Sequence, residues 1–456
     1  MSATSPELRG RTIRSSVTNS PAVLWSAFVL THLWLGFLNL TAEGQPLGDV
    51  INQYRYWTEQ ADLTSYYVGI DKSWVYPIVA LVPMVIAGIF GFGSYPSTWL
   101  WLVFVLDCVA FAALVGWRRP RRTPAIGWWW IAFLLLLGPI AMGRIDSISI
   151  PVAIVAVMLL SARPKLAAFL LTIATWIKVW PAALIAAVLI AGRPRLRIFV
   201  TAAITSVVIV GIALALGSGP NVFSFITQQT SRSLQIESPV STVWMWLSYF
   251  HIGGSFPYYV QDINTFEVTG PQTAAVSALL NPLLGIAVLV IAALGVVATQ
   301  RGAAVTELLA PLALAFVSAF ILFNKVGSPQ YMTWFSVPIL LGLATHSVGH
   351  GRSFRVPAAL ALVAAGLTQL FYPYFYQQLL ELNLSLLVVL TLRNIVTLAL
   401  FVWAVRVVVG LTRPFATHEV IADTETWLPT AWPFTERRHS GTPHDLDDST
   451  EKDSTA

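Results

Sequence analysis

Charged residues are scarce in this chain of 456 residues, where they make up 11% of the sequence against 56% hydrophobic residues. Soluble domains carry roughly 25% charged residues, so a water-soluble fold would leave too much apolar surface in contact with water. Cysteine is almost missing, because Cys108 stands alone. This excludes an internal disulfide and a cysteine metal site, and it leaves the redox compartment open. The composition predicts an integral membrane protein.

The motifs of soluble nucleotide chemistry are missing as well. The sequence has no Walker loop, no GxGxxG fingerprint, no HExxH pair and no repeat of solenoid period. It therefore predicts neither an ATP-driven pump nor a nucleotide-binding domain. The formal net charge of +5 does not indicate nucleic acid as a partner, because the basic residues form short clusters between apolar runs rather than one basic face.

Long apolar runs dominate what is present, and a membrane-spanning helix needs about 20 such residues. The twelve candidate runs are 21–40, 75–92, 99–117, 126–142, 148–160, 166–191, 198–216, 274–298, 308–323, 331–344, 356–372 and 384–409. They predict an all-α integral membrane protein, a polytopic helical bundle of about 12 transmembrane helices. The run 166–191 contains Lys178 and Pro181, which predicts a bent or re-entrant helix beside an internal cavity.

Basic residues recur on every second connection from residue 193 onward. By the positive-inside rule, this pattern predicts a multi-pass protein of the plasma (inner) membrane with both termini in the cytoplasm. Four arginines between residues 118 and 122 break the alternation, so the topology of residues 93–197 stays open. The connections expected on the external face are 41–74, 217–271, 324–330 and 374–383. We expect a cytoplasmic segment at 1–20, a transmembrane domain at 21–411 and a disordered cytoplasmic tail at 412–456.

The first external connection holds a candidate general base. Asp49 follows the first apolar run near the membrane surface, where partial desolvation suits a carboxylate to that work. Tyr54 lies in the same connection and Tyr76 directly follows it, and aromatic faces suit stacking on a sugar ring or a lipid chain. The simpler interpretation is that Asp49 is the N-cap of an interfacial helix over residues 50–60.

Three charged residues stand at or near membrane depth, where charges are costly. Arg144 and Asp146 interrupt two apolar runs, and Lys178 precedes Pro181 within a third. One interpretation is structural, with an ion pair between Arg144 and Asp146 and with Lys178 reaching to the interface. The other is functional, with the cations recognising a phosphate in a water-filled cavity. The residues alone leave both open.

A polar segment lies inside the long external connection 217–271. Arg232 could bind an anion there, and Glu237 could orient that anion or an acceptor. The alternative is an amphipathic surface helix whose charges are merely solvated. His251 follows an aromatic stretch and is either a further substrate contact or an ordinary interfacial histidine.

The connection before the run 331–344 is short and rich in hydrogen-bonding groups. Lys325, Gln330 and Tyr331 stand within seven residues, with Trp334 one turn later. This clustering predicts a ligand-facing loop, and snorkelling of Lys325 to the interface is the alternative.

Taken together, these residues resemble the polytopic glycosyltransferases of the GT-C superfamily, and in particular glycosyltransferase family 87, the actinobacterial polyprenyl-phosphate-mannose-dependent mannosyltransferase-like group. The likeness covers most of residues 21–410. The segments that carry it are Asp49 with Tyr76 and Pro77, residues 143–146 with Lys178 and Pro181, residues 325–331 with Trp334, and residues 232–238.

The resemblance implies a GT-C-like bundle with long external loops. It implies transfer of a sugar, foremost mannose, from a polyprenyl-phosphate donor to an acceptor hydroxyl on the external face, with inversion at the anomeric carbon. Asp49 would be the catalytic base, and Arg232, Lys325 and Arg144 would neutralise the leaving lipid phosphate. The residues expected to bind substrate are Tyr54, Tyr76, Asp146, Lys178, Glu237, His251, Gln330 and Tyr331.

The expected partners are the polyprenyl-phosphate sugar, a glycolipid or lipoglycan acceptor and the lipid bilayer. An arabinofuranosyltransferase is the nearest alternative, and a secondary transporter, a lipid flippase or an envelope scaffold belongs to another class. A transporter usually shows repeated halves and short external loops, and neither is visible here. We expect no cofactor and no metal, although Asp49, Asp62 and Asp71 could gather around a divalent ion.

Overall fold

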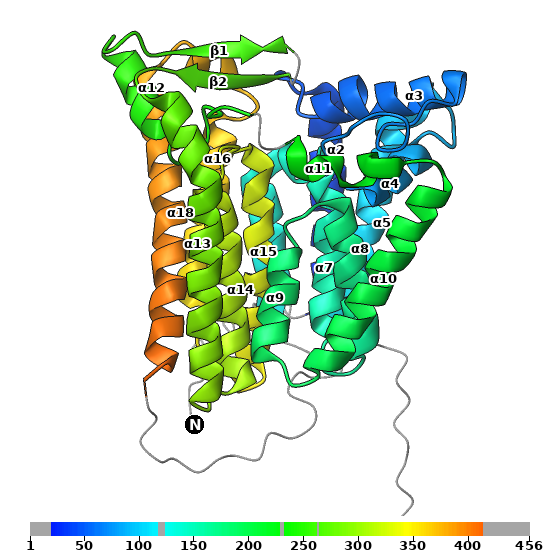
Figure 1. Ribbon diagram of the computed structural model, residues 1–456, viewed down its shortest axis with the longest axis vertical. Coiled ribbons are helices and arrows are strands. Elements are labelled where there is room, and N and C mark those ends of the chain that lie inside the picture. The colour runs from blue at the N-terminus through cyan, green and yellow to red at the C-terminus, as the bar shows by residue number, and fades with distance from the viewer. Residues whose placement is uncertain (1–19, 117–123, 229–231, 262–263, 414–456) are drawn as a thin grey trace, which may run out of the picture.

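Long helices packed side by side form the body of the computed structural model, which describes residues 20–116, 124–228, 232–261 and 264–413. Short helices and one two-stranded sheet gather at one end of this bundle (Figure 1). We call it the hairpin end, after strands β1 (Phe256–Val260) and β2 (Thr265–Thr269). The predicted N-terminal segment, the C-terminal tail and the arginines between residues 118 and 122 lie almost entirely outside the described ranges.

Seven helices in these ranges are long and apolar enough to cross a bilayer, with α5 counted together with the 3-10 turn that precedes it and α6 with the 3-10 turn that follows it. They are α2 (Pro21–Thr41), α5 (Tyr95–Val115), α6 (Pro124–Leu137), α10 (Arg195–Ala215), α13 (Thr273–Gln300), α14 (Val305–Leu322) and α18 (Leu384–Leu411). The finding supports a helical, multi-pass membrane protein. The number of about 12 spans stays a prediction.

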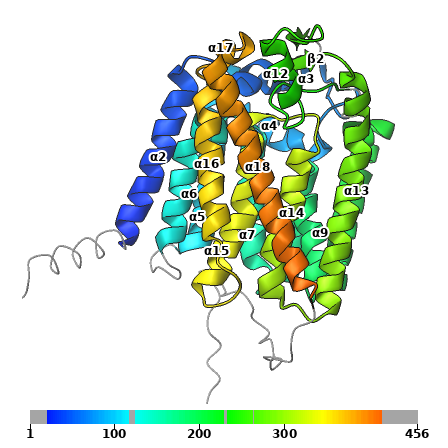
Figure 2. The same ribbon diagram turned by 90° about the vertical axis from the view of Figure 1, so that its left-hand side faces the viewer.

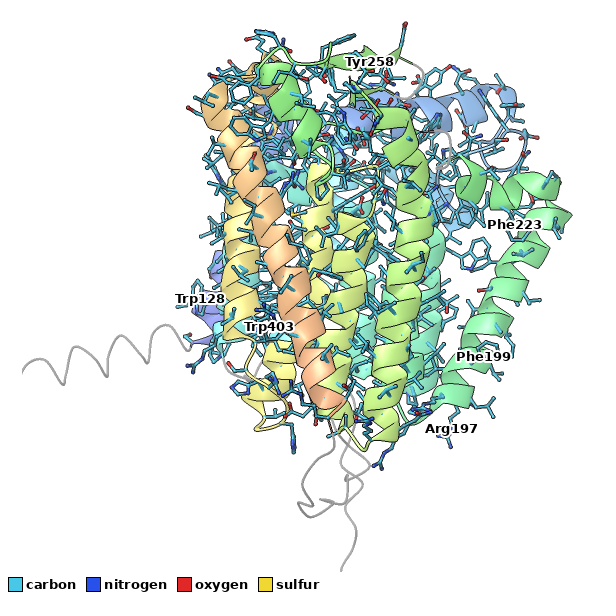
Figure 3. All side chains as sticks on the ribbon, turned by 60° about the vertical axis from the view of Figure 1, so that its left-hand side comes forward. Trp128, Arg197, Phe199, Phe223, Tyr258 and Trp403 are labelled. Carbon is cyan, nitrogen blue, oxygen red and sulfur yellow. The ribbon has the colours of Figure 1, made fainter. Side chains whose placement is uncertain are left out.

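Shorter apolar helices complete the bundle. They are α4 (Leu81–Ala87), α7 (Asp146–Leu159), α8 (Pro164–Ile177), α9 (Ala182–Ala191), α15 (Ser336–Ser347) and α16 (Arg355–Phe371). The core lies around α7 and α14, because 78% of the apolar window of α14 is buried, against 11% in α10. A helix that is apolar all round is buried in protein or faces lipid. Phe199 of α10 points outward, away from the bundle (Figure 3).

The apolar run 166–191 is broken in two, as Lys178 and Pro181 predicted. Helix α8 ends at Ile177, Lys178 is extended, with φ −149° and ψ 135°, and α9 begins at Ala182. The 3-10 turns Gly138–Ala141 and Pro329–Phe335 contact each other, and the second contacts α7, which packs on α8. Non-helical backbone at membrane depth is tolerated where protein surrounds it. These interruptions bring polar groups into the interior around α7.

The hairpin end departs from the all-α expectation. Strands β1 and β2 are antiparallel, with Phe256 opposite Thr269, and Gln235 forms an isolated bridge to Glu267. Residues 232–239 are not helical, so the alternative of an amphipathic surface helix there is wrong. The same end carries α3 (Arg55–Thr64), α12 (Thr242–Tyr249) and α17 (Tyr376–Leu380) (Figure 2), together with α11 (Ser224–Thr227) (Figure 1) and the π-helix Val50–Tyr54.

Candidate active site

A pair of opposite charges joins the first connection to the loop that precedes α7. The Nε atom of Arg144 lies 3.0 Å from Oδ2 of Asp49. The Arg144 side chain is 8% exposed, whereas that of Asp49 is 38% exposed. The helix that follows Asp49 receives no capping hydrogen bond from its side chain, so capping does not account for this carboxylate. Asp49 is an acid held by a buried cation and open on its other side.

Arg144 is fixed by further hydrogen bonds. Its Nη1 atom donates to the carbonyl oxygens of Pro46 at 2.6 Å and Gly143 at 2.8 Å, and Nη2 donates to the Tyr372 hydroxyl at 2.5 Å. The expected ion pair between Arg144 and Asp146 does not form. Arg144 pairs with Asp49 and Asp146 pairs with Lys178, because tertiary packing directs the two side chains toward different neighbours. Charge-assisted hydrogen bonds of this kind fix geometry strongly.

Asp146 and Lys178 form a second centre at the start of α7. Nζ of Lys178 lies 3.6 Å from Oδ2 of Asp146, and Nε1 of Trp334 donates to Oδ1 at 2.6 Å. Asp146 is 1% exposed, and its Oδ2 atom accepts no hydrogen bond. Nζ of Lys178 also lies 4.7 Å from the ring centre of Tyr76 and 5.8 Å from that of Tyr331, within cation–π range.

Aromatic residues connect the two centres. The Tyr54 hydroxyl accepts a hydrogen bond from the Ile145 backbone N–H at 3.2 Å and lies 3.5 Å from the Tyr76 hydroxyl. Burial raises the pKa of Tyr54 well above its ordinary value of 10. Tyr331 stacks on Trp334 with ring centres 4.1 Å apart. The predicted substrate residues Tyr54, Tyr76 and Tyr331 therefore share one site with Lys178.

Arg232 approaches this site from the long connection. Its charge is close enough to repel that of Lys178, and its buried Nε atom has no hydrogen-bond partner. Lys325 donates from Nζ to the Arg232 carbonyl oxygen at 3.2 Å. Burial lowers the pKa of Lys325, and the opposite charge of Glu267 partly offsets this effect. Two cations, Lys178 and Arg232, thus lie near one another, and Lys178 is paired with the buried Asp146 carboxylate.

The segment with Arg232 and the loop with Lys325 are bound to each other. The Gln235 N–H donates to the Lys325 carbonyl oxygen at 3.0 Å, and the Gly327 N–H donates to Oε1 of Gln235 at 3.1 Å. A side chain at Gly327 would collide with the backbone of Glu237 and Ser238. Glycine is therefore required for this close approach.

Glu237 lies near the pair formed by Arg144 and Asp49, and it is 1% exposed. Its Oε1 atom accepts a hydrogen bond from the Tyr376 hydroxyl at 2.6 Å, while Oε2 has no partner. Nη2 of Arg393 donates to the Glu237 carbonyl oxygen at 2.8 Å. Burial raises the pKa of the Glu237 carboxyl group to about 7.

Two predicted residues stand apart from these contacts. His251 is exposed just beyond α12, and no side-chain contact joins it to either centre within the described ranges. Gln330 is 7% exposed in the turn beside Tyr331, and its carbonyl oxygen accepts from the Thr333 hydroxyl at 2.7 Å. Within the described residues, no group of three His, Cys, Asp or Glu side chains is arranged to hold a metal ion.

Sequence reasoning overlooked several buried or partly buried polar residues. Tyr372 and Tyr376 link Arg144 to Glu237, although the aromatic stretch 372–376 offered a signal. A histidine and an aspartate inside apolar runs, His32 and Asp107, form a buried pair between α2 and α5. Ionisable residues within spanning helices deserve a functional or structural explanation by default. That rule would have found this pair and Arg393.

Comparison with known proteins identifies the family of this chain. No curated protein and no solved structure matches the chain. The model of glycosyltransferase family 87 matches residues 74–320, which is more than half of the sequence and includes both Lys178 and Arg232. The chain therefore belongs to glycosyltransferase family 87.

Proposed function

We propose that this glycosyltransferase moves mannose from a polyprenyl-phosphate donor to a hydroxyl of a glycolipid or lipoglycan on the external face of the membrane, with inversion. The observation that carries the proposal is Asp49, a carboxylate 38% exposed at the hairpin end and fixed by a buried arginine. A lipid-linked donor fits a membrane-embedded site, and the sequence holds no nucleotide-binding fingerprint.

Asp49 would act as the general base. In the transfer step the acceptor oxygen attacks the anomeric carbon, and its proton passes to Asp49. The bond between that carbon and the phosphate oxygen breaks, and its electron pair leaves with the lipid phosphate. Arg144 holds Oδ2 of Asp49 at 3.0 Å, which leaves Oδ1 to receive the proton. A positioned base contributes about 10²–10⁴-fold to rate.

The leaving phosphate needs preorganised positive charge. Lys178 and Arg232 are the cations that support this role best, because Nε of Arg232 is buried without a partner and Lys178 lies beyond hydrogen-bonding distance from Asp146. Arg144 is already engaged by Asp49 and Tyr372, and Lys325 by the Arg232 carbonyl oxygen. We therefore assign phosphate recognition to Arg232 with Lys178, and orientation of the base to Arg144.

The test is transfer of radiolabelled mannose from polyprenyl-phosphate mannose into membrane glycolipid by wild type, Asp49→Asn and Asp62→Asn at matched expression. Asp62 is an exposed acid of the same connection and serves as the matched control. We expect Asp49→Asn to lose at least about 100-fold in rate and Asp62→Asn to retain wild-type activity. Full activity in Asp49→Asn would move the base elsewhere. Transfer of arabinose but not mannose by wild type would replace the sugar in the proposal.

A further inference from the structure

A row of partly buried contacts connects Glu237 to Asp49. The Tyr376 hydroxyl donates to Oε1 of Glu237 at 2.6 Å. The Tyr376 ring meets that of Tyr372 edge to face, with ring centres 5.3 Å apart and an interplanar angle of 79°. The Tyr372 hydroxyl accepts from Nη2 of Arg144 at 2.5 Å, and Arg144 holds Asp49. Every link from Glu237 to the proposed base is therefore a direct side-chain contact.

Glu237 is the fixed end of this row. Arg393, which is fully buried in α18, donates to its carbonyl oxygen at 2.8 Å. Gly327 lies so close to the backbone of Glu237 and Ser238 that no side chain fits between them. Asp49, at the opposite end, is 38% exposed. The row thus runs from a buried carboxyl group to an acid that must meet the substrate.

We propose that Glu237 is a positioning residue, which fixes the Arg144 guanidinium through Tyr376 and Tyr372 and thereby aims the Asp49 carboxylate at the acceptor. This inference rests on the proposed function of Asp49. It differs from a direct contact between Glu237 and substrate, because Oε1 is occupied by Tyr376 and the side chain is 1% exposed. The charged groups around Glu237 are Arg393 on α18 and, through the two tyrosines, Arg144 before α7.

Three variants separate positioning from substrate contact. Tyr376→Phe removes only the hydroxyl that donates a hydrogen bond to Glu237. Glu237→Leu removes the acceptor of that hydrogen bond. Glu237→Gln keeps an acceptor oxygen at the same place. Small displacements of a catalytic group cost up to about 100-fold in rate. We therefore expect kcat to fall about tenfold or more in Tyr376→Phe and Glu237→Leu with donor KM nearly unchanged, and to recover in Glu237→Gln. A rise in KM at constant kcat would overturn positioning in favour of direct binding.

The matched control is Tyr258→Phe. The Tyr258 hydroxyl donates to Oε2 of Glu267 at 3.0 Å, so this variant also removes a tyrosine hydroxyl bonded to a buried glutamate at the hairpin end (Figure 3). It has no contact with Tyr372 or Arg144 among the described residues. We expect wild-type kcat in Tyr258→Phe. An equal loss of kcat in both tyrosine variants would indicate general loosening of this end and overturn the proposal.

A structural readout keeps the inference separate from the proposed function. Electron cryomicroscopy of Tyr376→Phe should show Arg144 displaced from its contact with Asp49, relative to wild type. If wild type transfers sugar and Arg144 stays in place in Tyr376→Phe with unchanged kcat, the positioning role fails while the function stands. If wild type transfers no sugar from any polyprenyl-phosphate donor, the proposed function fails, and the maps alone decide whether Glu237 holds Arg144.

Discussion

Two buried acid–base pairs of this protein differ in how completely their polar atoms are satisfied. Between α2 and α5, Nε2 of His32 lies 2.9 Å from Oδ2 of Asp107, and Nδ1 lies 2.9 Å from the Phe28 carbonyl oxygen. In the candidate site, Oδ2 of Asp146 accepts no hydrogen bond although Lys178 lies 3.6 Å away. The first pair is complete without a ligand, and the second is not.

Buried polar atoms are almost always hydrogen-bonded, so each exception requires an explanation. The exceptions at the hairpin end include Nε of Arg232 and Oε2 of Glu237, together with Oδ2 of Asp146. At Asp146 and Arg232 a substrate hydroxyl or phosphate oxygen would supply the missing partner, whereas Glu237 has a positioning role and makes no proposed contact with substrate. Buried atoms without a partner also occur outside the proposed site, for example at Ser161 and Asn394. Incomplete satisfaction therefore distinguishes Asp146 from Asp107 and does not by itself mark the catalytic region.

The largest effect on activity should follow from removing Lys178, the cation paired with Asp146. Lys178→Gln should lower kcat/KM for the lipid donor by about 100–1,000-fold, because it removes a preorganised charge from the leaving phosphate. Radiolabelled transfer by purified, monodisperse protein measures the loss. Lys178→Arg keeps the charge and should recover part of the activity. A folded Lys178→Gln variant with wild-type kcat/KM would remove Lys178 from the proposed site.

The pH dependence of stability tests whether the Glu237 carboxyl group is buried with an oxygen that lacks a hydrogen-bond partner. Its pKa is about 7 in the folded protein, against 4.5 ordinarily, so the folded state keeps this proton to higher pH. The free energy of unfolding contributed by Glu237 should therefore fall by about 3 kcal/mol as pH rises from 4.5 to 7, and then level off. Thermal unfolding in detergent should show this slope in wild type relative to Glu237→Gln. Parallel curves for the two proteins would contradict the assignment.

Arg232 should have a smaller effect that appears mainly in donor binding. Arg232→Gln removes one charge-assisted contact, so we expect donor KM to rise about tenfold, in line with a contribution of at least about 1.5 kcal/mol. Arg301→Gln is the matched control, because Arg301 is an exposed arginine that donates to the Thr412 carbonyl oxygen outside the site. Equal rises in KM for both variants would indicate a long-range effect of net charge instead of a local phosphate contact.

The sequence was sufficient for those parts of the fold that depend on local properties. The apolar run 198–216 matches α10, and the run 384–409 matches α18, because length and hydrophobicity alone define such helices. The break after α8 was predictable, since Pro181 lacks a backbone donor and Lys178 disfavours lipid. The β1–β2 hairpin was missed because its short strands lie inside a long polar connection.

The pairing of charges could not be predicted from the sequence. Adjacency suggested a bridge between Arg144 and Asp146, yet they pair with Asp49 and Lys178, respectively. These partners are set by the way helices pack around α7, which no local pattern encodes. The same reason explains why Tyr372 was overlooked, because its role depends on the hydrogen bond from Arg144 across the bundle.

The smallest effect on activity should come from changes to the buried pair of His32 and Asp107. Because Nδ1 of His32 faces a carbonyl oxygen and must donate its proton, Nε2 and Asp107 share the remaining proton. The amide of Asp107→Asn can donate to Nε2 instead, so this variant should lose less than about 1 kcal/mol, whereas Asp107→Leu strands a buried nitrogen and should lose about 1–3 kcal/mol. Both should keep wild-type kcat at temperatures where they stay folded. A loss of transfer by folded Asp107→Asn would show that complete satisfaction does not mark a pair as purely structural.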